Sequence, residues 1–572
     1  MKELKNMKGI TLIALVVTII VLIILAGVSI NMLFGQYGIV TRAKQAKEQM
    51  EVASIKEQIG LDILSKQAEN SGNITNSDLI NILNYYGKLS KEEQGLILTT
   101  TKGNYEIKVS DILNEINVKV PATLPEILGG ANSPDIKGFN VEKTHYVTWG
   151  TTSPYQINEL NETNTIDKEP PTGWSNYTGK QWANIITKGG DNECYWVWIP
   201  RYAYKVPTKG NIAQTIEIAF LKGTGSTIDD VIDETKKIEI ETAGGFKTTP
   251  TPGNWVIHPA FTNAGNGGFG ELTGIWVAKF EASSSSATDL TNLTTDKILT
   301  AIANDGGSET DTDLKVRVKP NVTSWRGINV NNIFTVCQNL KEPNNSLCGT
   351  NNTKNTALDP HMMKNIEWGA VAYLSRSIYG MNGEVWNNPY YNNTTNYSPI
   401  TGLCGNASNG KDNATTDITQ TYKYNETGGE NASTTGNVYG IYDMAGGAWE
   451  YVAGILSNYK SNSSNYDFSN STTYLNKYFD WYAGNTSDRN TNYDANANKY
   501  GDAVYETSSS GWSNTDSWDS SYSIFSTSSS PVFKRGGRVY DGSNAGVFAF
   551  IDSTGGAYTN DSFRPVVLSS QP

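Results

Sequence analysis

The chain has 572 residues, which is enough for two to four folded units joined by linkers. Its formal net charge is −12 at pH 7, and because no basic stripe offsets this acidic balance, the sequence argues against a nucleic-acid partner held through phosphate contacts. Only 18% of the residues are charged, whereas Asn, Ser, Thr, Gly and Tyr are abundant, which favours long hydrogen-bonded loops over helical bundles.

The chain begins with an uncharged apolar segment behind a basic start. Lys2, Lys5 and Lys8 precede a stretch that has no charged residue until Arg42. The centre of this stretch is long enough to cross a bilayer as a helix, so we expect a membrane anchor with its lysines in the cytoplasm and the rest of the chain on the bacterial surface. The apolar run is longer than that of a secretory signal, so its removal is not expected.

The sequence KGITLIALVV, which begins at Lys8, resembles the start of a type IV prepilin. The resemblance implies that residues 1–9 are a leader cleaved between Gly9 and Ile10, and that other pilin-like subunits are candidate partners. The family usually has a glutamate at the fifth mature position, where this chain has Ala14, so the carboxylate that pairs with a neighbouring subunit's N-terminal amine is missing. An ordinary transmembrane anchor is the alternative interpretation.

Three further segments precede the main domain. Beyond Arg42, apolar residues at helical spacing among many charges predict that residues 10–70 form one transmembrane and stalk helix. Residues 71–118 contain two short helical patterns around a strand pair, which predicts a small α+β module. Residues 119–137 contain several prolines and glycines and indicate a linker.

Residues 138–572 are expected to form one large domain of low regular secondary structure. Aromatic and β-branched runs at 194–206, 254–261 and 274–282 predict antiparallel strands, and the segment from Asp359 predicts a helix in which His361 caps or packs. The expected fold class is therefore α+β, with a long N-terminal transmembrane or pilin-like helix, a small module and this large domain.

Three segments of the large domain follow one another in the order known from one family. They are GIYDMAGGAWEY at 440–451, FKRGG at 533–537 and SFRPVVL at 562–568. Together they resemble the formylglycine-generating-enzyme (sulfatase-modifying-factor) family, and the resemblance extends over residues 138–570. It implies a C-type-lectin-like fold for this part of the chain.

The same resemblance implies a structural calcium site. Its ligands would be the side chains of Asp443 and Glu450 and the backbone carbonyls of Gly446 and Ala448, and oxygen ligands on a glycine-rich loop suit this hard cation. The alternative is that Asp443 caps a turn and Trp449 belongs to the core.

The family's oxidase chemistry is not expected. Catalytic members have two cysteines after the RGG motif, and Asp541 and Gly546 occupy those positions here. No cysteine follows Cys404, no CxxC pair occurs, and the three histidines are isolated, so a redox cofactor or transition metal would lack ligands. The sequence therefore predicts a protein that is not an enzyme.

Residues 535–568 resemble still more closely the variable proteins of diversity-generating retroelements, chiefly in NAGVFAF and FRPVV. In such proteins an error-prone reverse transcriptase substitutes template adenines, so that Asn codons change while scaffold codons persist. Lys, Glu, Gln, Met and Trp cannot arise in this way from an Asn codon, and residues 538–562 contain none of them. The alternative is a plain packed C-terminal hairpin.

On this hypothesis, tyrosines with small polar residues form a recognition face like that of an antibody. The candidate ligand-binding positions are Arg538, Val539, Tyr540, Asp541, Ile551, Asp552, Ser553, Thr554, Ala557, Tyr558, Thr559, Asn560 and Asp561. The expected scaffold consists of Gly536, Gly537, Ala545, Gly546, Val547, Phe548 and Phe550.

The sequence thus predicts a non-catalytic, surface-displayed binding protein with a protein or glycan ligand. One alternative is a minor pilin, pseudopilin or adhesin whose lectin-like head is invariant. The least favoured alternative is a formylglycine-type modifying enzyme, because both cysteines are missing.

Overall fold

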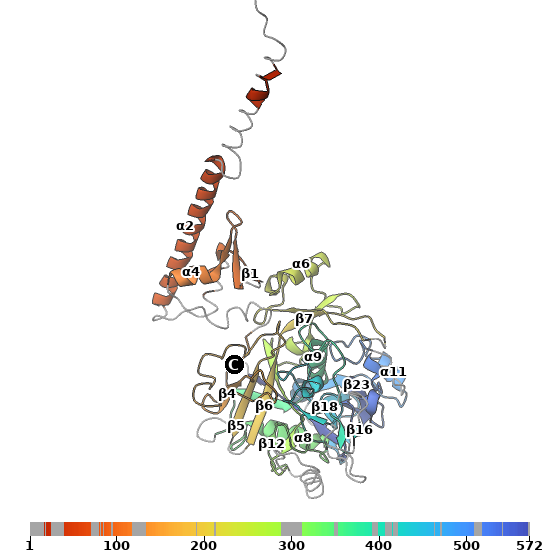
Figure 1. The fold of residues 1–572 in the computed structure, drawn as a ribbon. Helices are drawn as coiled ribbons and strands as arrows, with labels where there is room; N and C mark the ends of the chain where they lie inside the picture. The colour runs from red at the N-terminus through yellow and green to blue at the C-terminus, as the bar shows by residue number, and fades with distance from the viewer. Residues whose placement is uncertain are drawn as a thin grey trace, which may run out of the picture. The chain divides into compact units, whose positions relative to one another are not determined.

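The computed structural model divides the chain into two compact units, which we call unit 1 (Met1–Pro125) and unit 2 (Glu126–Pro572). Both are drawn in Figure 1. The residues that the structure describes are 16–17, 19–23, 39–69, 79, 82–83, 85–92, 95–116, 133–158, 160–189, 192–210, 213–287, 312–347, 353–391, 399–405, 414–415, 421–462, 464–469, 472–507, 518–539 and 541–569.

Unit 1 combines a long helix with a small sheet. Its elements are α2 (Ile39–Glu69), β1 (Gly87–Glu92), β2 (Gly95–Thr100), β3 (Glu106–Lys108) and α4 (Val109–Glu115), and the strands form an antiparallel sheet in the order β1-β2-β3. The C-terminal half of α2 supplies Ile59 and Ile63 to the core, where Leu98, Ile107 and Ile112 are also buried. This half of α2 therefore belongs to a folded module rather than to a free stalk.

The expected membrane anchor is corrected by this arrangement. Among the described residues, no helix is both long enough and apolar enough to cross a membrane. α2 carries charges along its exposed side, where Lys44 lies 3.9 Å from Glu48 and Lys47 lies 3.8 Å from Glu51. No described helix supports the predicted transmembrane stalk or the cell-surface location drawn from it, so both predictions are withdrawn. The leader 1–9, the processing pair Gly9 and Ile10, and most of the apolar run that follows them lie outside the described residues.

The predicted fold class is wrong as well, because the described chain is a mixed α/β structure with many small, mostly antiparallel sheets. The largest sheet, in unit 2, has six strands in the order β13-β25-β10-β6-β5-β4. Its strands are β4 (Thr144–Val147), β5 (Asn184–Gly189), β6 (Asn192–Pro200), β10 (Gly274–Ala278), β13 (Leu358–Met362) and β25 (Pro565–Ser569). Neighbouring strands of this sheet are not only those adjacent in sequence, because β25 pairs with both β10 and β13.

A second sheet carries the C-terminal segment. Its strands run in the order β21-β18-β22-β23, and β24 pairs with β18. They are β18 (Trp449–Leu456), β21 (Asp480–Tyr482), β22 (Val532–Gly536), β23 (Gly546–Ser553) and β24 (Asp561–Phe563). All of β18 and β22 is buried, so the two strands form the rigid centre of this sheet.

A third sheet, in the order β8-β7-β9, forms one end of unit 2 together with helix α6 (Figure 1). These elements are β7 (Tyr202–Lys205), β8 (Ile218–Phe220), α6 (Glu234–Thr242) and β9 (Trp255–Ile257). The short helix η1 (Ile228–Asp230) lies between β8 and α6, and η2 (Pro259–Phe261) follows β9. The small strand pairs of unit 2 are β11 (Ser283–Ser284) with β12 (Val316–Arg317), β14 (Tyr390–Tyr391) with β16 (Ala414–Thr415), β15 (Leu403–Gly405) with β17 (Thr421–Lys423), and β19 (Ser461–Asn462) with β20 (Tyr466–Asp467).

The remaining helices of unit 2 are short. They are α8 (Val330–Gln338), η3 (Asn339–Lys341), α9 (Asn365–Ser375), η6 (Gly429–Ala432), α10 (Thr472–Tyr478), α11 (Arg489–Asp494), η7 (Trp518–Ser520) and η8 (Gly542–Asn544). The α9 helix begins six residues later than the helical pattern predicts, because Asp359–Met362 pair with β25 instead. His361 is buried on that strand, and its Nε2 lies 3.0 Å from Oε1 of Glu367.

Candidate functional site

The C-terminal segment is a hairpin of β22 and β23 followed by β24. Arg535 pairs with Phe550, and the register then shifts so that Gly536 pairs with Gly546. Gly537 has φ +79°, and a Cβ there would lie 2.5 Å from the Cα of Ala545, so only glycine permits this close approach. All the residues expected to form the scaffold are buried. The hairpin therefore offers a fixed support for the loops that it carries.

The predicted ligand-binding positions divide by exposure. Ala557, Tyr558 and Thr559 are exposed, and Tyr558 retains 45% of its surface. Those that are partly buried are Arg538, Ile551, Asp552, Thr554 and Asn560. Those that are buried are Val539, Asp541, Ser553 and Asp561, and Tyr540 lies outside the described residues. We call Arg538, Thr554, Ala557, Tyr558, Thr559 and Asn560 the C-terminal patch.

Three contacts fix the orientation of Tyr558 in this patch. Its hydroxyl lies 2.8 Å from the hydroxyl of Thr554, and a Cβ on Gly556 would lie 3.2 Å from its ring. The ammonium of Lys534 is 5.9 Å from the ring centroid, which is within reach of a cation–π contact. The ring is therefore both exposed and braced by its neighbours.

Charges beneath the patch are paired within the protein. Lys534 donates to both carboxylate oxygens of the fully buried Asp561, at 3.0 and 2.9 Å. Burial raises the pKa of Asp561, and the charge of Lys534 opposes that rise. Arg489 contacts Asp552 at 2.9 Å, and Arg538 contacts Asp541 at 3.3 Å. Asp541, Asp552 and Asp561 therefore each form an ion pair within the protein, and these ion pairs link the segments that carry the patch.

Two segments that the sequence reasoning missed hold the loop that bears Tyr558. The amide of Gly327 donates to the carbonyl of Tyr558 at 2.9 Å, and the guanidinium of Arg326 donates to the carbonyl of Thr559 at 2.5 Å. Asn462 and Asn465 donate to the carbonyl of Thr554 at 3.3 and 3.0 Å. No motif marks these residues, because they act through backbone carbonyls far away in sequence.

The proposed calcium loop follows η6 and leads into β18. Asp443 has φ +63°, and its Oδ1 accepts hydrogen bonds from the side chain of Asn388 at 2.7 Å and the amide of Gly402 at 2.9 Å. Arg564 donates to both oxygens of Glu450, at 3.0 and 2.7 Å. Gly446 donates its N–H to the carbonyl of Gly536 at 3.2 Å. Both carboxylates are therefore already engaged by protein donors.

A third buried acid, Glu281, lies in the same cluster and was not predicted. Its Oε1 accepts from the amide of Ala448 at 2.8 Å, and its own N–H donates to Asp443 at 3.3 Å. Burial, together with the charges of Glu450 and Asp443, raises the pKa of Glu281 well above its usual range. Within the described part of the chain no group of three or more metal-binding side chains is found. Protein donors thus occupy oxygens of Asp443 and Glu450, whereas Oε2 of Glu281 is buried and has no hydrogen-bond partner among the described residues. The structural calcium ion stays a prediction.

Thiol chemistry finds no support at the described cysteines. Cys194, Cys337 and Cys404 are all buried and form no disulfide, and burial raises the pKa of each thiol. Asp541 and Gly546, which occupy the catalytic positions of the resembled family, carry no sulfur. Cys348 lies outside the described residues. A thiolate nucleophile is therefore disfavoured at the three described sites.

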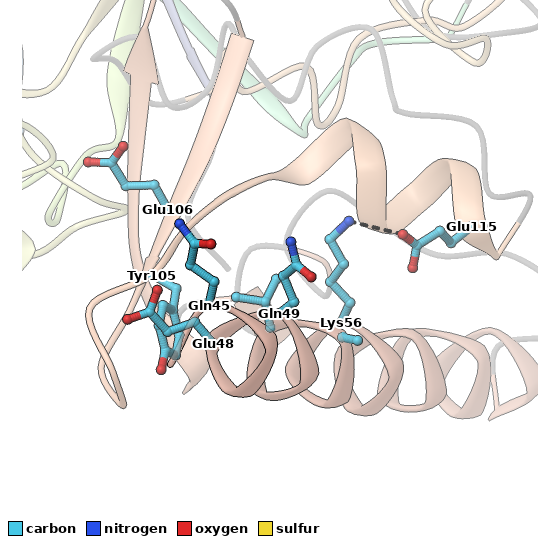
Figure 2. A pocket seen from close by; sticks show the side chains of 9 residues that line it. Gln45, Glu48, Gln49, Lys56, Tyr105, Glu106 and Glu115 are labelled. Carbon is cyan, nitrogen blue, oxygen red and sulfur yellow. Dashed lines mark hydrogen bonds and ion pairs between the residues drawn. The ribbon is translucent and has the colours of Figure 1, made fainter. Parts of the chain in front are cut away.

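Unit 1 has an open groove of about 640 Å³ between α2 and the β3–α4 segment, shown in Figure 2. Lys56 forms an ion pair with Glu115 at 2.9 Å at one end of it. Glu48, Tyr105 and Glu106 line the other end, and the hydroxyl of Tyr105 donates to Glu51. The groove lies on a charged helix face and contains none of the predicted site residues.

Comparison of the sequence with models of protein families gives no match. Comparison with curated protein sequences gives no significant match either.

Proposed function

We propose that this chain is a non-catalytic binding protein that holds a protein or glycan ligand on its C-terminal patch, and that the patch is diversified by a retroelement. The observation that carries the proposal is the exposed, braced side chain of Tyr558 in a loop supported by buried strands. Among the described residues of unit 2, the other large hydrophobic side chains with comparable exposure are Val141, Ile238 and Ile378. None of these three belongs to the C-terminal segment.

The chemistry of the patch supports recognition without turnover. Tyrosine offers a large contact area and a hydroxyl at a small cost in conformational entropy, and Thr and Asn add adaptable hydrogen bonds. Arg538 supplies one partly exposed cation. Because the patch rests on strands and on backbone hydrogen bonds, its side chains can change while their support stays in place.

The pattern of exposure makes the diversification hypothesis specific. Substitutions at Thr554, Ala557, Tyr558, Thr559 and Asn560 should be tolerated, because these side chains are exposed or partly exposed. Substitutions at Asp541 and Asp561 should be rarer among folded variants, because each is buried in an ion pair.

The decisive experiment is to sequence the DNA that encodes residues 530–572 from many cells of one strain, together with its flanks. We expect variation confined to adenine-derived codons, concentrated in the C-terminal patch, beside a template repeat and a reverse-transcriptase gene. An invariant segment without that cassette would overturn the diversification hypothesis. Variation spread evenly over scaffold and patch codons would contradict the proposed division between support and ligand face.

A further inference from the structure

Unit 2 contains a cleft of about 570 Å³ that shares no lining residue with the C-terminal patch. It lies beside the β8-β7-β9 sheet and is closed on one side by the segment that contains Asn498 and Tyr500. This volume is typical of sites for small ligands. We call it the unit 2 cleft.

Two partly exposed aromatic rings in the cleft are held by packing from behind. The ring of Tyr500 meets that of Tyr505 edge to face with centroids 5.9 Å apart, and the ammonium of Lys209 lies 3.3 Å from the centroid of Tyr505. Phe246 packs against the buried cluster that includes Trp255. Aromatic rings supported in this way present flat apolar faces without a large loss of side-chain entropy on binding.

The cleft wall depends on a glycine. Gly501 has φ +93°, and a Cβ at this position would lie 2.3 Å from Cγ of Pro259, which also lines the cleft. The segment of Tyr500 can therefore approach Pro259 closely enough to close one side. The backbone conformation at Gly501 therefore sets this side of the cleft, without any contribution from a side chain at that position.

The charge of the cleft disfavours a cationic ligand, and its other polar groups are uncharged. The described residues that line it include no aspartate or glutamate, although the chain as a whole has a net charge of −12. Its lysine, Lys247, donates to the carbonyl of Gly244 at 2.6 Å. Hydroxyl and amide groups are instead available on the exposed Ser226, Thr248 and Asn498. Flat apolar rings with surrounding hydroxyl and amide groups match the two kinds of surface on a neutral sugar.

We propose that the unit 2 cleft binds an uncharged saccharide, with an apolar sugar face against Phe246 and Tyr500 and sugar hydroxyls toward Ser226, Thr248 and Asn498. The site is independent of the proposed function, because it uses none of the residues of the C-terminal patch. A proline-rich peptide is the other ligand that stacks on aromatic grooves, but it would leave the hydroxyl and amide groups at the rim unused.

The full chain should be applied to an array of neutral oligosaccharides and to an immobilised decaproline peptide. The test variant is Phe246→Leu with Tyr500→Leu, which keeps apolar bulk but removes both aromatic faces. Asn498→Ala is a second variant at an exposed side chain, and Ile378→Ala, at a 58% exposed side chain outside both the cleft and the C-terminal patch, is the matched control. Tyr558→Ala tests separately whether a sugar binds at the C-terminal patch. Circular dichroism of aromatic side chains would establish that each variant is folded.

We expect a neutral oligosaccharide to bind, the double variant to weaken that binding about tenfold or more, and Asn498→Ala to weaken it about threefold. Ile378→Ala should bind the same sugar as the unchanged chain does. The proposal is overturned if no sugar of the array binds, if decaproline alone binds, or if a bound sugar is released by Tyr558→Ala and not by the cleft variants. Each of these results leaves the sequencing test of the C-terminal patch unaffected.

Discussion

Glu506 illustrates how burial alters a single residue of unit 2. Its side chain is 1% exposed, and its Oε1 accepts hydrogen bonds from the hydroxyl of Tyr204 at 2.7 Å and from the amide of Gly501 at 2.5 Å. Burial, and then the charge of Asp502, raises the pKa of Glu506 to about 7. The folded protein therefore holds this proton over a pH range in which the unfolded chain has lost it.

Glu506 should make unit 2 less stable as the pH rises. Between pH 4.5, the usual carboxyl pKa, and about 7, the folded state binds more protons than the unfolded state, so the free energy of unfolding falls with pH, by an amount on the order of 3 kcal/mol. Glu506→Gln keeps an oxygen acceptor for Tyr204 and cannot ionise. Thermal unfolding measured from pH 5 to 8 should show a shallower decline for this variant, whereas Glu142→Gln, at an exposed position, should follow the unchanged chain. Equal slopes for all three proteins would contradict the role of Glu506.

The ion pair of Lys534 with Asp561 provides a second test at the scale of residues. Asp561→Ala should lower the free energy of unfolding by about 3 kcal/mol, because it leaves the ammonium of Lys534 buried without its partner. The double variant Lys534→Met with Asp561→Leu should recover part of that loss, because it replaces both charges with apolar groups. Chemical denaturation of the three proteins measures the difference. A double variant no more stable than Asp561→Ala would show that shape at this site matters more than charge.

At the scale of elements, helix α2 has one side buried against the sheet of unit 1 and one side exposed to solvent. Ile59 is fully buried on the side that meets the sheet, whereas Leu61, two residues later, is 55% exposed. Ile59→Ala should therefore destabilise unit 1 by about 3 kcal/mol through loss of burial and the cavity that remains, while Leu61→Ala should change its stability by less than about 0.5 kcal/mol. Helix content followed during thermal unfolding of the full chain would measure both. Similar effects of the two substitutions would mean that the exposed side of α2 is covered.

At the scale of the whole molecule, the chain divides between Pro125 and Glu126. The main core of unit 2 extends from Phe139 to Leu568 and draws its residues from that unit alone. A protein that begins at Glu126 should therefore fold by itself and unfold cooperatively at the same temperature, within about 3 °C, as unit 2 in the full chain. Calorimetry of both proteins measures this. A large drop in the unfolding temperature would show that unit 2 depends on unit 1.

Local sequence patterns were sufficient for several features of this protein. The aromatic run 194–206 predicts strands where β6 and β7 occur, and the run 274–282 predicts the strand β10, because alternating β-branched and aromatic residues suit a pleated surface in any context. The aromatic residues of β23 could be assigned to the scaffold for the same reason, and Gly537 because glycine permits a tight backbone path. The absence of cysteine at positions 541 and 546 is a property of the sequence alone.

Tertiary structure decided which residues are available to a ligand. Asp561 and Tyr558 belong to the same predicted face, yet the first is buried by its pairing across β18 and the second is exposed. Likewise, the N–H of Glu281 donates to Asp443, which lies 162 positions away in the sequence. The residues that precede α9 form the strand β13 instead of a helical turn, because they pair with β25. Strand register and ion pairs between distant segments determine these outcomes, because they depend on which neighbour a residue meets, and no local pattern encodes that neighbour.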